Sequence, residues 1–346
     1  MKRKTIVDQF FLRLYIVLPT VYPFYDTGEL SLLKEKKFQN WAYWHYAYLL
    51  CVVLFGAYVR ATGAGAGCGS HWPLCDGQVI PRTFFHERLI EYSHRVSSGL
   101  SLFFTCAMYI YSLKIFPKFH LARKMAKYCL IFIIIEALLG GALVLLNHVA
   151  DNPSLYRGVS ISLHLINTFL LMASATGLIF FSTVENSNFS LFRHKYFLLF
   201  FFGFVCLLFS STSGAITALG DTLFPVASVS EAFMKSFDFK HHLWVTVRIY
   251  HPFLAIFSSI YIFLSVRKVS QVSQCFKQAI CFVYFCLFFQ LSLGFLNVFF
   301  HAPVVLQILH LFLAHFLWAG YVLVYLNSHL YLSSLSSFSF GKSVVR

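Results

Sequence analysis

The sequence predicts an all-α integral membrane protein with eight transmembrane helices. Of its 346 residues, 58% are hydrophobic, only 12% are charged and 42 are phenylalanine. This composition is far more apolar than that of a soluble domain. Apolar windows of about 20 residues, the length that crosses roughly 30 Å of hydrocarbon, recur eight times along the chain.

The elements follow one another with short connections. Residues 1–41 are expected to form a cytoplasmic or interfacial segment, because Arg13, Pro19 and Pro23 interrupt their apolar run. No small-residue cleavage site follows this run, so a signal peptide is not predicted. Residues 329–346 are expected to form a cytoplasmic tail. The eight predicted spans cover 42–60, 88–113, 124–147, 158–182, 194–217, 242–266, 277–300 and 303–328.

The distribution of positive charge predicts the topology. Most of the 27 Lys and Arg residues lie in the two terminal segments and in alternate loops, at 114–127, 193–195 and 267–277. By the positive-inside rule, both termini are expected in the cytoplasm. The net charge of +14 does not indicate nucleic-acid binding, because no basic run carries a groove-reading pattern. We expect a multi-pass protein of the cell inner membrane, or of the mitochondrial inner membrane if the source is eukaryotic.

The chain is predicted to be internally duplicated. A first four-helix bundle, 42–182, is followed by an inner linker, 183–195, and a second four-helix bundle, 196–328. Such repeats are common among membrane proteins. Two short echoes favour the duplication: Glu136-Ala-Leu-Leu-Gly140 matches Gln290-Leu-Ser-Leu-Gly294, and Thr62-Gly63-Ala64 matches Ser213-Gly214-Ala215.

Four histidines lie inside even-numbered spans, each roughly six to nine residues from its outer end, which is a depth of about 9–14 Å. They are His94, His164, His251 and His310. Two imidazoles at one depth on facing helices suit the axial ligation of a heme. The natural pairs are His94 with His164 and His251 with His310. His315 lies about 140° further round the last helix, so it cannot face the same iron as His310. The alternative for any single one is a packing histidine bonded to a neighbouring carbonyl or hydroxyl.

Glu91 precedes His94 by one helical turn, and Arg95 shares the same helix face. Ionisable residues at membrane depth are costly and therefore indicate function. Glu91 could relay a proton or orient a water; alternatively it forms a buried salt bridge with Arg95. Arg248 stands three residues before His251, where Glu91 precedes His94. This difference favours the N-terminal half as the reactive one.

Three further charged residues are candidates by position. Arg95 and Arg248 lie near the predicted outer surface and suit heme propionates, because a guanidinium pairs a carboxylate bidentately. Glu136 lies in the middle of the third span and is a candidate for a proton path. The predicted position of each residue in the membrane is what makes it a candidate.

Cys68 and Cys75 lie in the first outer loop, where Gly69 and Pro73 favour a turn. A disulfide is feasible there, and it could relay electrons or hold a docking loop, or act only as a structural staple. The other cysteines lie in or beside helices and are expected to behave as small apolar residues.

In their order along the chain, these motifs resemble the heme A synthase (CtaA/Cox15) family from about residue 42 to residue 328. The residues that carry the resemblance are Thr62-Gly63-Ala64-Gly65, Cys68, Trp72-Pro73-Leu74-Cys75, Glu91 with His94-Arg95, Leu163-His164-Leu165-Ile166-Asn167, the run from Ser213 to Pro225, Arg248-Ile249-Tyr250-His251-Pro252 and Leu309-His310-Leu311. The resemblance implies two four-helix bundles related by a pseudo-twofold axis. It also implies the oxidation of the C8 methyl of heme O to a formyl group, which gives heme A for terminal oxidases.

The resemblance also implies a role for each residue. His251 and His310 would ligate a heme b cofactor, and His94 and His164 the substrate heme. Glu91 matches the family's essential acid. Cys68 and Cys75 match a cysteine pair found in one subset of members.

Expected partners are heme O, a heme O synthase, an electron donor, the lipid bilayer and a second copy of the chain. Two other classes of protein would use the same histidines. One is a di-heme electron-transfer cytochrome, and the other is a heme transporter or chaperone.

Overall fold

The computed structural model describes residues 29–83, 85–184, 189, 195–226, 228–238, 240, 242–271 and 276–343. Residues 1–28, and with them most of the predicted N-terminal segment, lie outside this part, as does most of the predicted linker 183–195. Among the described residues no strand forms, and Cys75 with Gln78 makes an isolated β-bridge. The all-α prediction is confirmed.

Within the described residues, eight helices are long and apolar enough to cross a membrane, as predicted. They are α2 (Glu29–Ala61), α3 (His86–Ile115), α4 (Leu121–Leu145), α5 (Leu155–Phe181), α6 (Phe197–Leu223), the continuous span Leu243–Ser270, α10 (Lys277–Phe299) and α11 (Val304–Ser343). The span Leu243–Ser270 consists of α8 (Leu243–Thr246), η3 (Val247–Ile249) and α9 (Tyr250–Ser270). The short elements η1 (Ala64–Ala66) and α7 (Val229–Phe237) lie in loops.

Two helices are longer than their apolar windows. α2 begins before residue 42 and includes Lys34, Lys36 and Lys37, and α11 continues well beyond residue 328. A hydropathy window measures the thickness of the hydrocarbon and does not mark where a helix ends. The ends of these two helices therefore extend past the apolar segments that predicted them.

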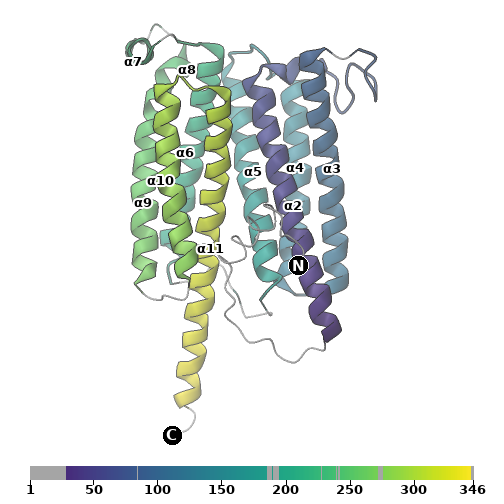
Figure 1. Ribbon diagram of the computed structural model, residues 1–346, viewed down its shortest axis with the longest axis vertical. Coiled ribbons are helices and arrows are strands. Elements are labelled where there is room, and N and C mark those ends of the chain that lie inside the picture. Colours follow the sequence, from purple (N-terminus) through teal and green to yellow (C-terminus); the bar gives the residue numbers. More distant parts are fainter. Residues whose placement is uncertain are drawn as a thin grey trace, which may run out of the picture.

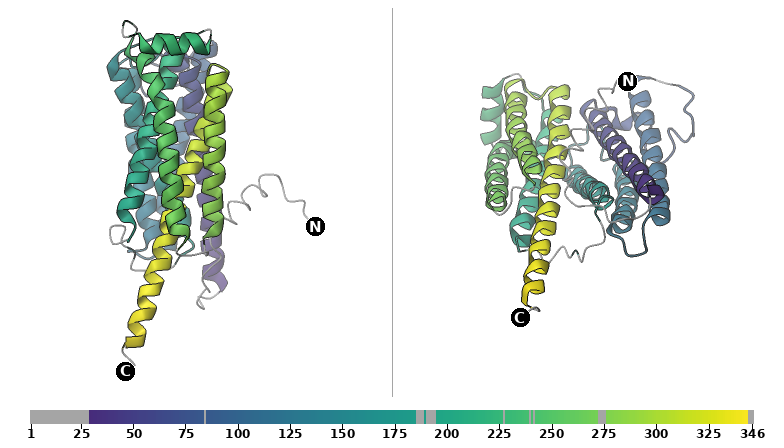
Figure 2. Two further views of the ribbon diagram at one scale, coloured as in Figure 1. Left: turned by 90° about the vertical axis from the view of Figure 1, so that its left-hand side faces the viewer. Right: turned by 60° about the horizontal axis from the view of Figure 1, so that its bottom comes forward.

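The spans form two groups that stand side by side (Figure 1). In the N-terminal group, α2, α3, α4 and α5 pack against one another, and in the C-terminal group α6, α9, α10 and α11 do so. Helices α5 and α11 join the groups, because α5 packs on both α6 and α11, and α2 also packs on α11. The two groups are also distinct when the molecule is turned (Figure 2).

Burial divides the helices into central and peripheral ones. α5 and α11 are the most buried spans. Peripheral α10 presents large apolar side chains outward, among them Phe288, Phe295 and Phe299. In a membrane such side chains face lipid, where they carry no hydrophobic penalty. The core of the molecule therefore lies between the two groups.

An aromatic contact marks this central seam. Phe169 of α5 and His315 of α11 have ring centroids 4.5 Å apart, and His315 is fully buried. Phe169 follows His164 by five residues, and His315 follows His310 by the same interval. Corresponding positions of the two groups thus touch each other at the seam.

Two long side chains join the groups at the upper end of the molecule (the top in Figure 1). Arg60 of α2 donates to the carbonyl of Ala218 at 3.1 Å and to Oε1 of Gln307 at 2.8 Å. In the other direction, Trp244 of α8 donates its indole N–H to the carbonyl of Pro153 at 2.8 Å. Buried donors without partners are costly, so these bonds fix the two groups relative to each other.

Candidate functional site

Each of the four predicted histidines lies on one spanning helix with its ring against a glycine of the preceding span. The pairs are His94 of α3 with Gly56 of α2, His164 of α5 with Gly140 of α4, His251 of α9 with Gly214 of α6, and His310 of α11 with Gly294 of α10. A Cβ atom added at these glycines would lie 3.1, 3.7, 2.8 and 3.3 Å from the nearest ring carbon, respectively. Glycine therefore makes room for an imidazole between the helices, most clearly at Gly214 and Gly56.

His94 of α3 and His164 of α5 both lie within the N-terminal group. Nδ1 of each ring is buried without a hydrogen-bond partner among the described residues. A histidine that binds a metal through one ring nitrogen keeps the other ring nitrogen for a hydrogen bond. This pair would hold a heme through its Nε2 atoms, with both Nδ1 atoms left free.

His251 and His310 face each other within the C-terminal group. Their ring centroids are 6.4 Å apart and their planes are nearly perpendicular. Metal–imidazole bonds of about 2 Å place two opposed ligating nitrogens about 4 Å apart, and the ring centres lie farther apart by one ring radius on each side. A separation of 6.4 Å thus fits one metal ion between the rings. Oγ of Ser213 lies 3.0 Å from Nδ1 of His251 and fixes that ring.

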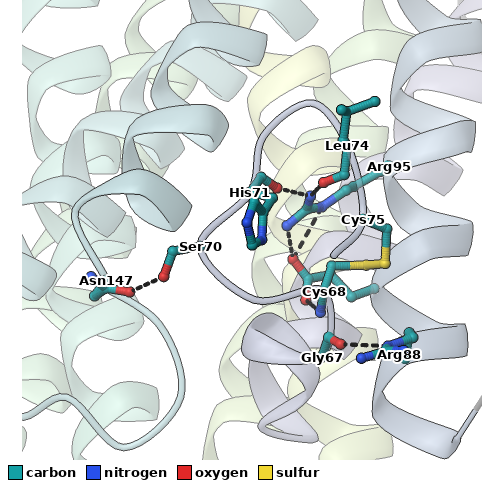
Figure 3. A network of polar contacts seen from close by, with 10 residues as sticks. Gly67, Cys68, Ser70, His71, Leu74, Cys75, Arg88, Arg95 and Asn147 are labelled. Atoms are coloured by element: carbon teal, nitrogen blue, oxygen red, sulfur yellow. Dashed lines mark hydrogen bonds and ion pairs between the residues drawn. A yellow bond between two sulfur atoms is a disulfide. The ribbon is translucent and has the colours of Figure 1, made fainter. Parts of the chain in front are cut away.

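Arg95 binds the loop between α2 and α3 (Figure 3), and Glu91 binds the same loop. Glu91 accepts the backbone N–H of Cys68 at 2.7 Å and pairs with Arg95. Arg95 also donates to the carbonyls of His71 and Leu74. The buried salt bridge that the sequence suggested for Glu91 is therefore present, and it positions a loop as well as a helix face.

The loop itself closes over the upper end of the N-terminal group. Cys68 and Cys75 are joined by a disulfide, and Gly69 adopts a positive φ of 64°. Oγ of Ser70 donates to Asn147, which follows α4. The ring of Trp72 lies on Gly141, where an added Cβ would be 2.8 Å from it. The loop is therefore held on both the α3 and the α4 side.

Arg248 holds the corresponding place beside His251. Its Nη1 donates to Oδ1 of Asp221 at 2.9 Å, and its Nη2 donates to the carbonyl of Phe224 at 3.3 Å. These contacts tie η3 to the end of α6. Arg95 and Arg248 both lie at the upper end with these internal partners, and their role toward heme propionates stays a prediction.

Comparison with known proteins identifies the family. The family model described as "Cytochrome oxidase assembly protein", COX15-CtaA, matches residues 39–322. The chain belongs to the COX15-CtaA family. Two proteins of Thermus thermophilus named "Protoheme IX farnesyltransferase" are 41% identical over 276 residues, which is 78% of this chain and 45% of each relative. "Heme A synthase" of Bacillus mycoides is 34% identical over 113 residues, which is 33% of this chain and 36% of that protein. The chain thus spans less than half the length of the Thermus relatives.

The sequence of this COX15-CtaA protein did not point to all of these contacts. Gly140 and Gly294 belong to one predicted echo, and both indeed contact a histidine. The other echo paired Gly63 with Gly214, but Gly63 lies in a turn after α2, whereas Gly214 lies within α6 against His251. The glycine that takes the corresponding place is Gly56. Ser213 stood next to Gly214 in the predicted echo, but the sequence did not indicate that it would contact His251.

Proposed function

We propose that this protein is a heme A synthase, which oxidises the C8 methyl of heme O to a formyl group. The observation that carries the proposal is that each helix group has a histidine pair, but the residue three positions before the first histidine of the pair is an acid in only one group. Glu91 precedes His94, and Arg248 precedes His251. Family membership and the names of the Bacillus relatives support a role in heme A synthesis.

His251 and His310 would hold a heme b cofactor, because their spacing fits two ligands of one metal ion. When bound, heme b supplies one-electron chemistry that side chains cannot perform. The chain orients its ligands: Ser213 engages Nδ1 of His251, which leaves the other ring nitrogen for the iron. Arg248 at the upper end suits a propionate of this group.

His94 and His164 would hold heme O as substrate. A methyl group is inert to acids and bases, so its conversion to a formyl group needs an oxidant from outside the chain. With water as the oxygen source, four electrons and four protons leave and an electron acceptor must take the electrons; with O2 as the oxidant, the electron donor supplies the electrons that complete its reduction to water. What the chain adds is a proton acceptor, because each carbon–hydrogen bond that is lost releases a proton. Glu91, one turn from His94, would hold that proton at its carboxylate oxygens, or orient a water there. The loop above it would exclude bulk water.

The proposed setting follows from the topology and the relatives. We place the protein in the inner membrane with both termini in the cytoplasm. The Thermus relatives are named for farnesyl transfer to protoheme IX, which favours a heme O synthase as the partner that supplies the substrate. An electron donor and a second copy of the chain complete the proposed partners.

Pigment analysis tests this function directly. The full chain is expressed in a host that makes heme O but no heme A, and the porphyrins that co-purify with it are extracted and identified. A heme A synthase yields a formyl heme, and an empty-vector host provides the control. Two unmodified, permanently bound hemes would instead identify a di-heme cytochrome. Reversible heme binding without any product would identify a transporter or chaperone.

A further inference from the structure

Glu136 lies in the middle of α4 and faces the ring of His164. Its Oε1 is 3.6 Å from Nδ1 of His164, and its side chain is 16% exposed. This distance is longer than a hydrogen bond, but a small movement of the ring toward the carboxylate closes one. Nδ1 of His164 is buried without a hydrogen-bond partner among the described residues. The carboxylate is therefore aimed at the ring nitrogen that a metal-bound histidine leaves free.

The helix that carries His164 also fixes the direction of this carboxylate. Asn167 donates from Nδ2 to Oε2 of Glu136 at 2.5 Å, and Oγ1 of Thr168 contacts Oε1. Asn167 and Thr168 follow His164 by three and four residues, so all three share one face of α5. Together they hold the carboxylate in one orientation.

The C-terminal group has neutral residues at every corresponding position. Gln290 precedes Gly294 as Glu136 precedes Gly140, and its Nε2 lies 3.2 Å from Nε2 of His310. The residues three and four after His310 are Leu313 and Ala314, where the N-terminal group has Asn167 and Thr168. The N-terminal group thus has an acid and two side chains that donate hydrogen bonds to it, whereas the C-terminal group has none of the three.

A carboxylate behind a metal-bound histidine accepts the ring N–H and makes the imidazole a stronger electron donor. Hydrogen bonding behind the ligand is one of the means by which a protein sets the potential of a heme. We propose that Glu136 is a positioning residue that makes His164 a more electron-donating ligand than His310, and so lowers the reduction potential of the N-terminal heme relative to the C-terminal one. The inference rests on the proposed binding of a heme by each histidine pair.

Reduction potentials measured site by site test this inference. The full chain, loaded with heme, is titrated by spectroelectrochemistry in the His310→Ala background to isolate the N-terminal heme and in the His164→Ala background to isolate the C-terminal heme. In the first background, Glu136→Gln should shift the ferric/ferrous equilibrium at least tenfold toward the ferrous form, a rise of about 59 mV for a one-electron couple. Glu136→Asp keeps the charge and should move the potential less.

The C-terminal heme serves as the control. In the His164→Ala background, Glu136→Gln should leave the potential of that heme unchanged, because Glu136 lies in the other group. An unchanged potential of the N-terminal heme in Glu136→Gln overturns the inference. If that variant retains no N-terminal heme, the Glu136→Asp measurement decides, and an unchanged potential there overturns the inference. A protein that shows these shifts but makes no formyl heme refutes the proposed function and leaves this inference standing.

Discussion

The two helix groups share a framework and differ in the side chains that surround it. Each sets two histidines on alternate spans, and each makes room for the rings with glycines. Around the N-terminal pair stand Glu91, Glu136 and the disulfide loop. Around the C-terminal pair stand Arg248 with Asp221, and Gln290. The two groups thus share the arrangement of histidines and glycines and differ in the charged side chains around it.

The two groups also differ in how firmly they hold one histidine. Nδ1 of His251 is fixed by Ser213. Nδ1 of His94 lacks a hydrogen-bond partner among the described residues. The ring of His94 instead packs edge-on against Phe55, with ring centroids 5.5 Å apart. A hydrogen bond orients a ligand ring more strictly than an aromatic contact does. This difference suits a resident group in the C-terminal half and an exchanging one in the N-terminal half.

The largest effect should come from removing a ligand of the resident group. His251→Ala or His310→Ala is expected to abolish the low-spin b-type absorption spectrum of the purified protein and all formyl heme, because one axial ligand is lost. His94→Ala is the matched control and should keep the b-type spectrum while losing product. A b-type spectrum that survives His251→Ala would reverse the assignment of the two groups.

The next largest effect should separate chemistry from binding within the N-terminal group. Glu91→Ala is expected to reduce formyl heme by about 10²–10⁴-fold, the usual contribution of a general acid or base, while the C-terminal heme stays bound. Glu91→Gln can still accept the Cys68 N–H and so serves as the control for loop position. If Glu91→Gln makes product at the normal rate, Glu91 acts only by holding the loop.

Much of this comparison could be predicted from the sequence. Eight apolar windows give eight spans because hydrophobic length is a strong signal, and histidines stand out against such windows. The Glu91–Arg95 pair follows from helical spacing alone. The ends of α2 and α11 could not be predicted, because hydropathy does not detect where a helix continues beyond the hydrocarbon.

Contacts between helices could not be predicted, because they depend on how each helix is rotated about its axis. The sequence cannot show that Gly56 meets His94, or that Trp72 rests on Gly141. The same holds for the link from Arg60 to Gln307 across the two groups. The contact of Glu91 with a backbone N–H of the loop carries no side-chain signal at all. These contacts shape the site but leave little trace in residue patterns.

A graded series tests whether both groups use glycine in the same way. Alanine at each histidine-facing glycine should weaken heme binding most where its Cβ would lie closest to the ring, because overpacking costs about 1–3 kcal/mol. The expected order is Gly214, Gly56, Gly294 and Gly140, from 2.8 to 3.7 Å. Heme content per polypeptide is measured for each variant, with Gly99→Ala as control, since an added Cβ there meets no atom within 4 Å. Equal heme content in Gly214→Ala and Gly140→Ala contradicts this explanation.

The smallest effect is expected from the disulfide, although the loop it closes is bound to the N-terminal group. Glu91 and Arg95 bind the loop through the N–H of Cys68 and the carbonyls of His71 and Leu74. These are backbone groups, so they remain when both cysteines are replaced by alanine. Hydrogen bonds to charged groups contribute about 1.5–3 kcal/mol each, and closing so short a loop contributes about 2–3 kcal/mol.

The double variant Cys68→Ala/Cys75→Ala should therefore lower the melting temperature by a few degrees and reduce formyl heme by less than about tenfold. Arg95→Met removes the clamp but keeps the disulfide, and it should impair product formation more. A disulfide that relays electrons predicts the opposite order, with loss in the double variant as severe as in Glu91→Ala. The ratio of these two activities thus decides whether the N-terminal group needs its cysteines for electrons or only for the shape of its cover.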